Sequence, residues 1–378
     1  MKIKQYKVYQ LSLPFSLQIS HSLADRVETE AIIVEITDEN GLKGYGEGTP
    51  RHYVTGETIE GASMAAVDFL GRLAEVDLID QTTLFLFLEE LGNSSLAAKR
   101  PAAWCAVELA FLDLFAKNRE RPLWQLFTSR PKTDTFTYSA VLPLVTRKTF
   151  EAMMPMIRSY GMKFIKTKVE NLEDGVTMLE ALRTALGSGI DVRVDANCAF
   201  SGQEAVNFLE KASHLKISAF EQPVPKDDLD GMAFVVSSAD VPVIADESFC
   251  SFDDAMQLKE RQAASGLNIR LSKCGGFLKS HSIMNNLKES DFFFQIGCHV
   301  GETAILSAAG RHLAALHPEI RFLEGSFSTF LLKEDVTEDK IIFGPGGEAP
   351  LLEKPGLGID VQMDRVKPWS LLLAADQV

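Results

Sequence analysis

Hydrophobic and polar positions alternate with a period of two along the first fifty residues, which is the pattern of half-buried β-strands. The alternation predicts strands over residues 2–13, 28–37 and 42–47, arranged as an antiparallel meander. The period then lengthens to that of amphipathic helices at about residues 57–73, 83–91 and 102–117. The glycines of GLKGYGEG (residues 41–48) match no phosphate-binding loop, since no helix follows directly, and we expect them in a hairpin.

A second, regular pattern begins after residue 130. Short β-branched and aromatic runs start at intervals of 24 to 29 residues, near Phe136, Phe164, Asp191, Ile217, Val241, Gly266, Asp291 and Ile320. Amphipathic stretches such as residues 172–186, 203–215 and 252–260 lie between them. Eight such units predict an α/β fold, a (β/α)8 barrel of the TIM type whose eighth helix is shortened or replaced. An open, doubly wound sheet is the alternative, because the pattern alone does not prove closure.

The division into domains follows from these two patterns. Residues 1–130 are expected to form an α+β capping domain that selects the substrate, and residues 131–339 the barrel with the catalytic site. Beyond residue 339 the chain is rich in glycine and proline, as in GPGGEAPLLEKPGLGIDV (residues 344–361). We expect residues 340–378 to return to the capping domain, which would then be discontinuous.

Composition excludes several classes of protein. Lys plus Arg number 38 against 52 for Asp plus Glu, so the net charge is −14 and a nucleic-acid partner is not expected. The five cysteines are widely spaced without a CxxC pair, which suggests neither a zinc site nor a disulfide framework. No apolar run has the length of a signal peptide or a membrane span. A cytoplasmic protein without a membrane partner is the resulting expectation.

Three carboxylates fall at the ends of successive predicted strands. Asp195, Glu221 and Asp246 are 26 and 25 residues apart, so one strand-helix unit separates each from the next. The C-terminal ends of barrel strands surround the active-site mouth, and three carboxylates there repel one another unless a hard cation neutralises them. The set predicts a Mg2+ site, with Mn2+ as the other possibility. The alternative is that these residues are N-caps of the following helices.

Three lysines accompany the carboxylates. Lys166 and Lys168 are two residues apart and share a face of the second barrel strand, while Lys273 ends the sixth, on the opposite side of the ring. Paired inside a barrel, Lys166 and Lys168 should lower each other's pKa, and such a lowered pKa lets Lys168 act as a base. The alternative is a set of solvated lysines at strand ends. With the metal between them, Lys168 and Lys273 suit removal and return of a proton α to a carboxylate.

The motifs KTK (166–168), DAN (195–197), EQP (221–223), ADES (245–248) and SKCGG (272–276) resemble, in this order and spacing, the enolase superfamily and its muconate lactonizing enzyme subgroup. The resemblance covers essentially the whole chain. It implies Asp195, Glu221 and Asp246 as Mg2+ ligands, and Lys168 and Lys273 as the acid/base pair with Lys166 as a helper. It also implies Asn197 and Glu247 as supporting polar residues, and it is compatible with a homo-oligomer.

The substrate-binding residues follow less directly. After the seventh strand the chain reads GCHVGET, which makes Cys298 and Glu302 candidates, whereas His299 is interpreted as structural because strand six carries Lys273. At strand eight Glu324-Gly-Ser326 only partly matches the Asp-x-Asp that holds the substrate ammonium in dipeptide epimerases. Residues 16–27 and 51–56 are the expected substrate loops. Their Arg26, Arg51 and His52 could touch an anionic substrate, or be solvated.

The interpretation is therefore a Mg2+-dependent enzyme that abstracts the proton α to the carboxylate of a small substrate. A racemase or epimerase of an amino acid derivative or dipeptide is the first hypothesis. The alternatives are a muconate-type cycloisomerase or an eliminating enzyme such as o-succinylbenzoate synthase, since LLKEDVTEDKIIF (residues 331–343) is similar to muconate cycloisomerases. A barrel that only binds a ligand is the remaining alternative.

Overall fold

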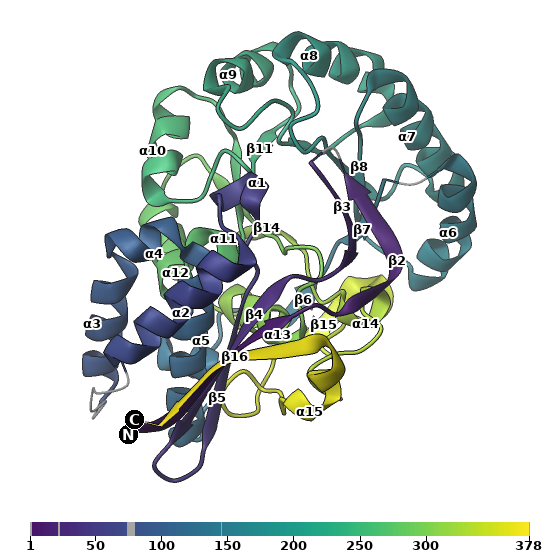
Figure 1. Cartoon of the computed structure of the whole chain (residues 1–378). Coiled ribbons are helices and arrows are strands. Elements are labelled where there is room, and N and C mark those ends of the chain that lie inside the picture. The colour runs from purple at the N-terminus through teal and green to yellow at the C-terminus, as the bar shows by residue number, and fades with distance from the viewer. Residues whose placement is uncertain (1, 22, 74–79, 145, 378) are drawn as a thin grey trace.

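The computed structural model describes residues 2–21, 23–73, 80–144 and 146–377. Its first sheet contains the three strands expected near the N-terminus, β1 (Ile3–Leu11), β4 (Ala31–Asp38) and β5 (Lys43–Gly48), each antiparallel to its neighbour. The last strand of the chain, β16 (Ser370–Gln377), pairs with the free edge of β1. The C-terminal segment thus returns to the N-terminal sheet, and Figure 1 shows the two termini side by side.

The segment between the first and second of these strands is a hairpin and not an irregular loop. It consists of β2 (Pro14–His21) and β3 (Ala24–Glu28), which pair antiparallel. In the view of Figure 1 the hairpin lies inside the ring of barrel helices. Its base is fixed to the barrel, because Phe15 bridges to Leu332 and the backbone N–H of Lys333 donates to Pro14.

Helices α2 (Ile59–Leu73) and α5 (Pro101–Asn118) pack against this sheet, α2 on β1 and β4 and α5 on β4 and β5. The other helices of the N-terminal part are α1 (His52–Thr55), α3 (Gln81–Gly92) and α4 (Ser95–Lys99). A Cβ on Gly44, Gly46 or Gly48 of β5 would lie within 2.3 Å of a backbone carbonyl oxygen of α5. Three of the four glycines of GLKGYGEG therefore let a helix lie directly on the strand, which is a role beyond the hairpin predicted for them, while Gly41 lies in the turn with a φ of 86°.

The barrel predicted from the sequence is present and closed. Around the ring the strands are β7 (Ala140–Leu142), β8 (Phe164–Lys168), β9 (Asp191–Asp195), β10 (Ala219–Glu221), β11 (Val243–Ala245), β12 (Gly266–Ile269), β13 (Phe293–Ile296) and β14 (Ile320–Leu323). A parallel bridge from Tyr138 to Leu323, with the Ser139 N–H donating to the Leu323 carbonyl at 2.8 Å, joins the last strand to the first. This closure excludes the open doubly wound sheet.

The helices of the barrel are α6 (Arg147–Tyr160), α7 (Leu172–Leu186), α8 (Gly202–Lys211), α9 (Leu229–Ser238), α10 (Phe252–Glu260), α11 (Leu271–Cys274), α12 (Phe277–Leu287), α13 (Ala304–Ala314) and α14 (Ser328–Leu331). The eighth helix, α14, has a single turn, as the sequence predicted. The first barrel strand was placed four residues early. The run at Phe136 forms β6 (Thr135–Thr137), which pairs outside the barrel with β15 (Glu348–Pro350).

The remaining short elements are the 3-10 turns η1 (Leu123–Leu126), η2 (Ser213–Leu215), η3 (Pro345–Gly347) and η4 (Lys367–Trp369), and α15 (Met363–Val366). Among the described residues no helix is both long and apolar enough to cross a membrane.

Buried carboxylates of the N-terminal part cap barrel helices. Glu47 of β5 accepts hydrogen bonds from the N–H groups of Thr303 and Leu306 at the start of α13. Glu108 of α5 accepts from the N–H groups of Phe277 and Leu278 at the start of α12. These caps satisfy N–H groups that the helices themselves cannot satisfy, and they fix the N-terminal part against the barrel.

Candidate active site

Three carboxylates stand at the ends of adjacent barrel strands. Asp195 and Glu221 are the last residues of β9 and β10 and are paired in register, and Asp246 directly follows β11. All three side chains are fully buried. The parallel ladder therefore brings together, at one end of the barrel, the three acids that the sequence placed there.

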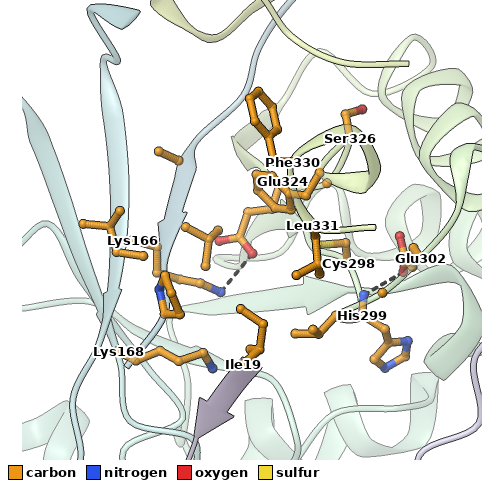
Figure 2. Close-up of a pocket in the computed structure, with 18 of the residues that line it drawn as sticks. Ile19, Lys166, Lys168, Cys298, His299, Glu302, Glu324, Ser326, Phe330 and Leu331 are labelled. Carbon is orange, nitrogen blue, oxygen red and sulfur yellow. Dashed lines mark hydrogen bonds and ion pairs between the residues drawn. The ribbon is translucent and has the colours of Figure 1, made fainter. Parts of the chain in front are cut away.

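Lys166 and Lys168 extend from β8 into the site, and Figure 2 shows Lys166 facing Glu324. The Lys166 Nζ lies 3.0 Å from a Glu221 oxygen, 2.9 Å from Glu324 Oε2 and 3.5 Å from Asp195 Oδ2. The Lys168 Nζ donates to Asn197 Oδ1 and lies 3.6 Å from Asp195 Oδ2. Both lysines line the same cavity.

The charge on Lys166 differs from the prediction. Burial acts to lower the pKa of Lys166, but the charges of Glu221, Glu324 and Asp195 outweigh it and leave that pKa raised. The expectation that the lysine pair lowers the pKa of Lys166 is therefore wrong for this structure. Its ammonium is an electrostatic partner of the acids and is not a base in this arrangement.

Lys273 lies in the short helix α11 and not at the end of β12, which stops at Ile269. Its ammonium donates to the Asp246 carbonyl at 2.7 Å, to Asp246 Oδ1 at 2.8 Å and to the Asn268 carbonyl at 2.9 Å. Burial lowers the pKa of Lys273, and the charge of Asp246 more than offsets this, so the pKa is raised. An ammonium has three donors, so all three are used here, and Lys273 does not line the cavity.

The donor set of Asp195, Glu221 and Asp246 fits a hard cation, because it offers only oxygen ligands in a buried, partly repulsive cluster. Burial and the charges of Asp195, Glu324 and Asp246 raise the pKa of Glu221 to about 8 despite Lys166. Within the described part of the chain, however, no three Asp, Glu, His or Cys side chains converge as a preformed metal site. Binding a cation would require Lys166 and Arg270, which hold these oxygens, to release some of them.

Arg270 and Arg193 were missed by the sequence analysis. Arg270 Nη2 donates to Asp246 Oδ2 and lies 3.7 Å from Glu221 Oε1, and Arg193 Nη2 donates to Glu324 Oε1 at 2.6 Å. The signal that could have found Arg193 is its place two residues before Asp195 on β9, since residues i and i+2 of a strand share a face. Arg270 follows Asn268 of β12 in the same way, and Asn268 Nδ2 donates to Glu221 Oε1 at 2.9 Å.

Asn197 and Glu247 lie beside the acids, as the family resemblance implied. Asn197 Nδ2 donates to Glu247 Oε1 at 3.1 Å, and its backbone N–H donates to Asp195 Oδ1 at 3.0 Å. Burial, with the charge of Asp246, raises the pKa of Glu247 to about 7. Asn197 contacts Lys168 and Glu247 is the neighbour of Asp246 in the chain, so their hydrogen bond connects these two sides of the site.

A cavity of about 530 Å3 opens beside these groups. Glu302, Glu324 and Cys298 line it, together with Ile19 of the β2–β3 hairpin and Tyr53 of α1. Figure 2 shows Glu324 facing Lys166, and Glu302 facing the backbone of His299, whose N–H donates to Glu302 at 2.6 Å. Burial raises the pKa of Glu302 to about 8.

The cationic residues proposed for the capping loops do not reach the cavity. Arg51 is buried, donates to the carbonyls of Glu30, Pro50 and Val300 at 2.7 to 2.9 Å and is not a lining residue of the cavity, so it joins loops. Arg26 pairs with Glu30 at 2.8 Å and lies over the ring of Tyr53, and His52 is exposed. Neither of the two is a lining residue of the cavity. Contact of these residues with a substrate stays a prediction that the lining of the cavity does not support, because a loop's sequence does not show which side chain turns inward.

His299 lines the cavity and has a structural contact as well. Its Nδ1 lies 2.8 Å from the hydroxyl of Thr49, and burial holds its pKa well below the usual value. The backbone N–H of Thr49 also donates to Ser272, the residue before Lys273, at 2.8 Å. One residue beyond β5 thus contacts both loops that flank the carboxylates.

Comparison with known proteins gives matches over nearly the whole chain. Residues 7–128 match the mandelate racemase / muconate lactonizing enzyme N-terminal domain, and residues 149–365 match the family described as enolase C-terminal domain-like. A hydrophobic dipeptide epimerase of Enterococcus faecalis is 30% identical over 85% of this chain and 89% of its own. An N-succinyl-L-Arg/Lys racemase of Bacillus cereus is 28% identical over 97% of each chain.

Solved structures agree with these matches. The crystal structure of the Bacillus cereus N-succinyl Arg/Lys racemase aligns with a TM-score of 0.89, at 28% identity and over all of both chains. The Enterococcus faecalis dipeptide epimerase, solved with Mg and the dipeptide L-Leu-L-Tyr, aligns with a TM-score of 0.86 at 29% identity, over 95% of this chain and 100% of the other.

Proposed function

Because the chain belongs to the mandelate racemase / muconate lactonizing enzyme family of the enolase superfamily, we propose that it is a Mg2+-dependent racemase or epimerase of an N-substituted amino acid or dipeptide. The observation that carries the proposal is the placement of Lys168 and Lys273. They come from β8 and from the segment after β12, which stand on opposite sides of the eight-stranded ring, with Asp195, Glu221 and Asp246 on the strands between them.

The residues divide the reaction between two faces of the substrate. Lys168 lines the cavity and takes or returns the α-proton on one face, while Lys273 serves the other face after releasing one of its three acceptors. Asp195, Glu221 and Asp246 would hold Mg2+, for which Mn2+ is the alternative. A bound divalent cation supplies stabilisation of the negative charge that develops on the substrate carboxylate. Lys166 would add a fixed positive charge beside it.

The test is exchange of the substrate α-proton with solvent deuterium, followed by NMR together with inversion, in the presence of Mg2+. Lys168→Ala and Lys273→Ala should each slow racemisation by roughly 10²–10⁴, the usual contribution of acid/base catalysis. Each variant should keep exchange with one enantiomer and lose it with the other, because only one face has lost its base. Lys163→Ala, an exposed lysine directly before β8, is the matched control and should exchange both enantiomers normally. Racemisation that survives Lys273→Ala at full rate refutes the two-lysine assignment.

The metal site is tested separately by calorimetric titration of Mg2+. Asp195→Asn should weaken Mg2+ binding strongly, whereas Asp253→Asn on the exposed first turn of α10 should leave it unchanged. Equal affinity in Asp195→Asn would mean that the three carboxylates are not the site.

A second candidate function rests on one observation, the absence of Lys273 from the lining of the cavity. With Lys168 as the only acid/base lysine, the same site suits cycloisomerisation or syn elimination. Exchange of one enantiomer without inversion in the unmodified enzyme would favour this candidate over racemisation.

A further inference from the structure

The cavity beside the lysines continues away from the carboxylates along an apolar wall. This wall is formed by α6, α14 and the segments next to them, and its side chains are Leu142, Met153, Met156, Ile157, Tyr160, Met162, Phe327, Phe330, Leu331 and Phe343. Its aromatic rings are in contact, since Phe330 packs against Tyr160 with ring centroids 6.1 Å apart and against Phe343 at 5.7 Å. The wall is therefore one continuous surface that joins the first and last helices of the barrel.

Charge is confined to the other end of the cavity. Among the described lining residues, those with a chargeable side chain are Lys166, Lys168, Asp195, Glu247, Arg270, His299, Glu302 and Glu324, at the strand ends and in the loop after β13. The weakly acidic lining groups are the thiol of Cys298 and the phenols of Tyr53 and Tyr160, of which only Tyr160 belongs to the wall. None of the apolar wall residues carries a charge. A substrate that reaches from the lysines to α6 thus passes from a highly charged region to an uncharged one.

Two wall residues are more exposed than an apolar side chain usually is. Met156 is 50% exposed and Phe330 is 37% exposed, and both line the cavity. Leaving them in water forgoes burial worth about 25 cal/mol for each Å2. An apolar ligand group lying along the wall would recover that burial.

The charge of Glu324, the acid that follows β14, is already compensated by two cations. Both Glu324 oxygens accept from cations, Oε1 from Arg193 at 2.6 Å and Oε2 from Lys166 at 2.9 Å. Gly325 and Ser326 follow it, so no second acid stands beside Glu324. Arg193 is no partner for a substrate carboxylate either, because it donates to Glu324 and Ser139 and does not line the cavity. Among the described residues along the wall, neither a charged amine nor a second carboxylate of the substrate has a partner of opposite charge.

We propose that the substrate carries a large, uncharged, apolar group that lies along the wall formed by α6 and α14, on the side away from its reacting carboxylate. This inference rests on the proposed function, since it places the reacting carboxylate at the lysines. It deepens that function to a substrate class, N-acylated amino acids whose acyl group or side chain is apolar, in preference to N-succinyl or free-ammonium substrates.

Binding to the Mg2+-loaded enzyme tests the inference without turnover. Calorimetry with N-acetyl-, N-butanoyl-, N-hexanoyl- and N-octanoylglycine should show Kd falling about threefold for each added methylene until the wall is covered. N-succinylglycine and glycylglycine should bind more weakly than N-pentanoylglycine, which is close to the succinyl compound in size. A matching series of N-acetyl amino acids from alanine to norleucine lengthens the side chain of the substrate and keeps its acyl group constant. Comparison of the two series shows which of the two substrate groups contacts the wall.

Phe330→Glu places a charge on the wall and should remove most of the dependence of Kd on chain length. Phe252→Glu on α10 is the matched control, because Phe252 is 38% exposed and lies outside the cavity, and it should keep the full dependence. If the enzyme racemises N-acetyl amino acids but its Kd does not change with chain length in either series, the inference is overturned and the proposed function stands. A chain-length dependence without α-proton exchange in any compound overturns the proposed function and the inference with it.

Discussion

At the scale of single residues, the centre of the barrel is an array of buried charges of both signs. Five acidic side chains face five cationic ones, namely Asp195, Glu221, Asp246, Glu247 and Glu324 against Lys166, Lys168, Arg193, Arg270 and Lys273. Burying a charge is costly unless a partner and hydrogen bonds compensate for it. Removal of one member should therefore leave its partners uncompensated, which makes the array sensitive to single substitutions.

Glu324→Gln tests this sensitivity. Glu324 compensates Arg193, which is fully buried, and Lys166 at the same time. Loss of its charge should lower the free energy of unfolding by about 3–5 kcal/mol, the usual cost of breaking a buried pair from one side. Urea unfolding measures the change. Adding Arg193→Met should restore part of it, whereas Glu348→Gln, in the exposed pair with Lys163, should cost no more than about 1 kcal/mol. An effect of Glu324→Gln as small as that of Glu348→Gln would contradict the account.

The sequence predicted part of this array for a definite reason. Asp195, Glu221 and Asp246 repeat at the spacing of one strand-helix unit, and a parallel ladder converts that spacing into proximity. Arg193 lies in β9 and Arg270 directly follows β12, and both were missed because a basic residue at such a position does not show, without its partners, that it is buried. Arg51 was assigned to the substrate because two of its three carbonyl partners, Glu30 and Val300, lie in segments that the sequence does not bring together.

At the scale of elements, regular periodicity was the reliable guide. Helices α7 and α10 have the predicted bounds, and the barrel strands begin within a few residues of the predicted positions. The β2–β3 hairpin was missed because its stability comes partly from contact with the segment after α14, as the Phe15–Leu332 bridge shows. The displaced start of the first barrel strand has a similar cause, since Phe136 pairs with Ala349 far along the chain.

The cap on α12 gives the protein a dependence of stability on pH. Burial raises the pKa of Glu108 from its usual 4.5 to about 8. Between pH 4.5 and pH 8 the Glu108 carboxyl is protonated in the folded protein and ionised in the unfolded chain. The contribution of this proton to the free energy of unfolding is therefore fully present below pH 4.5 and is lost as pH rises to about 8. Glu108→Gln is neutral at every pH and keeps the acceptor, so it should remove this loss. Urea unfolding at pH 6 and pH 8 should show roughly 2 kcal/mol less decline in the variant than in the unmodified protein.

The control for this measurement is Glu89→Gln, because Glu89 is exposed on α3. It should leave the decline with pH unchanged. Equal declines in Glu108→Gln and in the unmodified protein would mean that burial of Glu108 does not govern the dependence.

The residue after β5 links the N-terminal sheet to the site. Thr49 contacts His299 through its hydroxyl and Ser272 through its backbone, so Thr49→Val removes one contact and keeps the other. Loss of a neutral hydrogen bond costs about 1 kcal/mol, and we expect kcat to fall several-fold with little change in KM, because the substrate itself is not touched. Thr49→Ser should restore kcat. A change confined to the melting temperature would indicate a purely structural contact.

At the scale of the whole molecule, the chain starts and ends in one sheet and builds the barrel in between. β16 pairs with β1 over seven residue pairs, and the caps from Glu47 and Glu108 tie that sheet and α5 to the barrel helices. The domain bounds of 1–130, 131–339 and 340–378 stay a prediction.

The net charge of −14 has one local explanation in the structure. Three of the 52 acidic residues form the candidate cation site, where a bound divalent cation would offset two of their charges.

Such connections predict that the sheet and the barrel unfold together. Two of the three tryptophans, Trp104 and Trp124, lie in α5 and η1. When Trp369 is replaced by phenylalanine, tryptophan fluorescence therefore reports on the N-terminal part. Far-ultraviolet circular dichroism reports mostly on the barrel helices. The two urea curves should coincide. Deletion of residues 370–377 should shift both curves equally, by about 3 kcal/mol or more, because the hydrogen bonds along β1 are lost at roughly 0.5–1.5 kcal/mol each. Separate transitions, with only the fluorescence curve shifted by the deletion, would show that the buried caps do not couple the two parts.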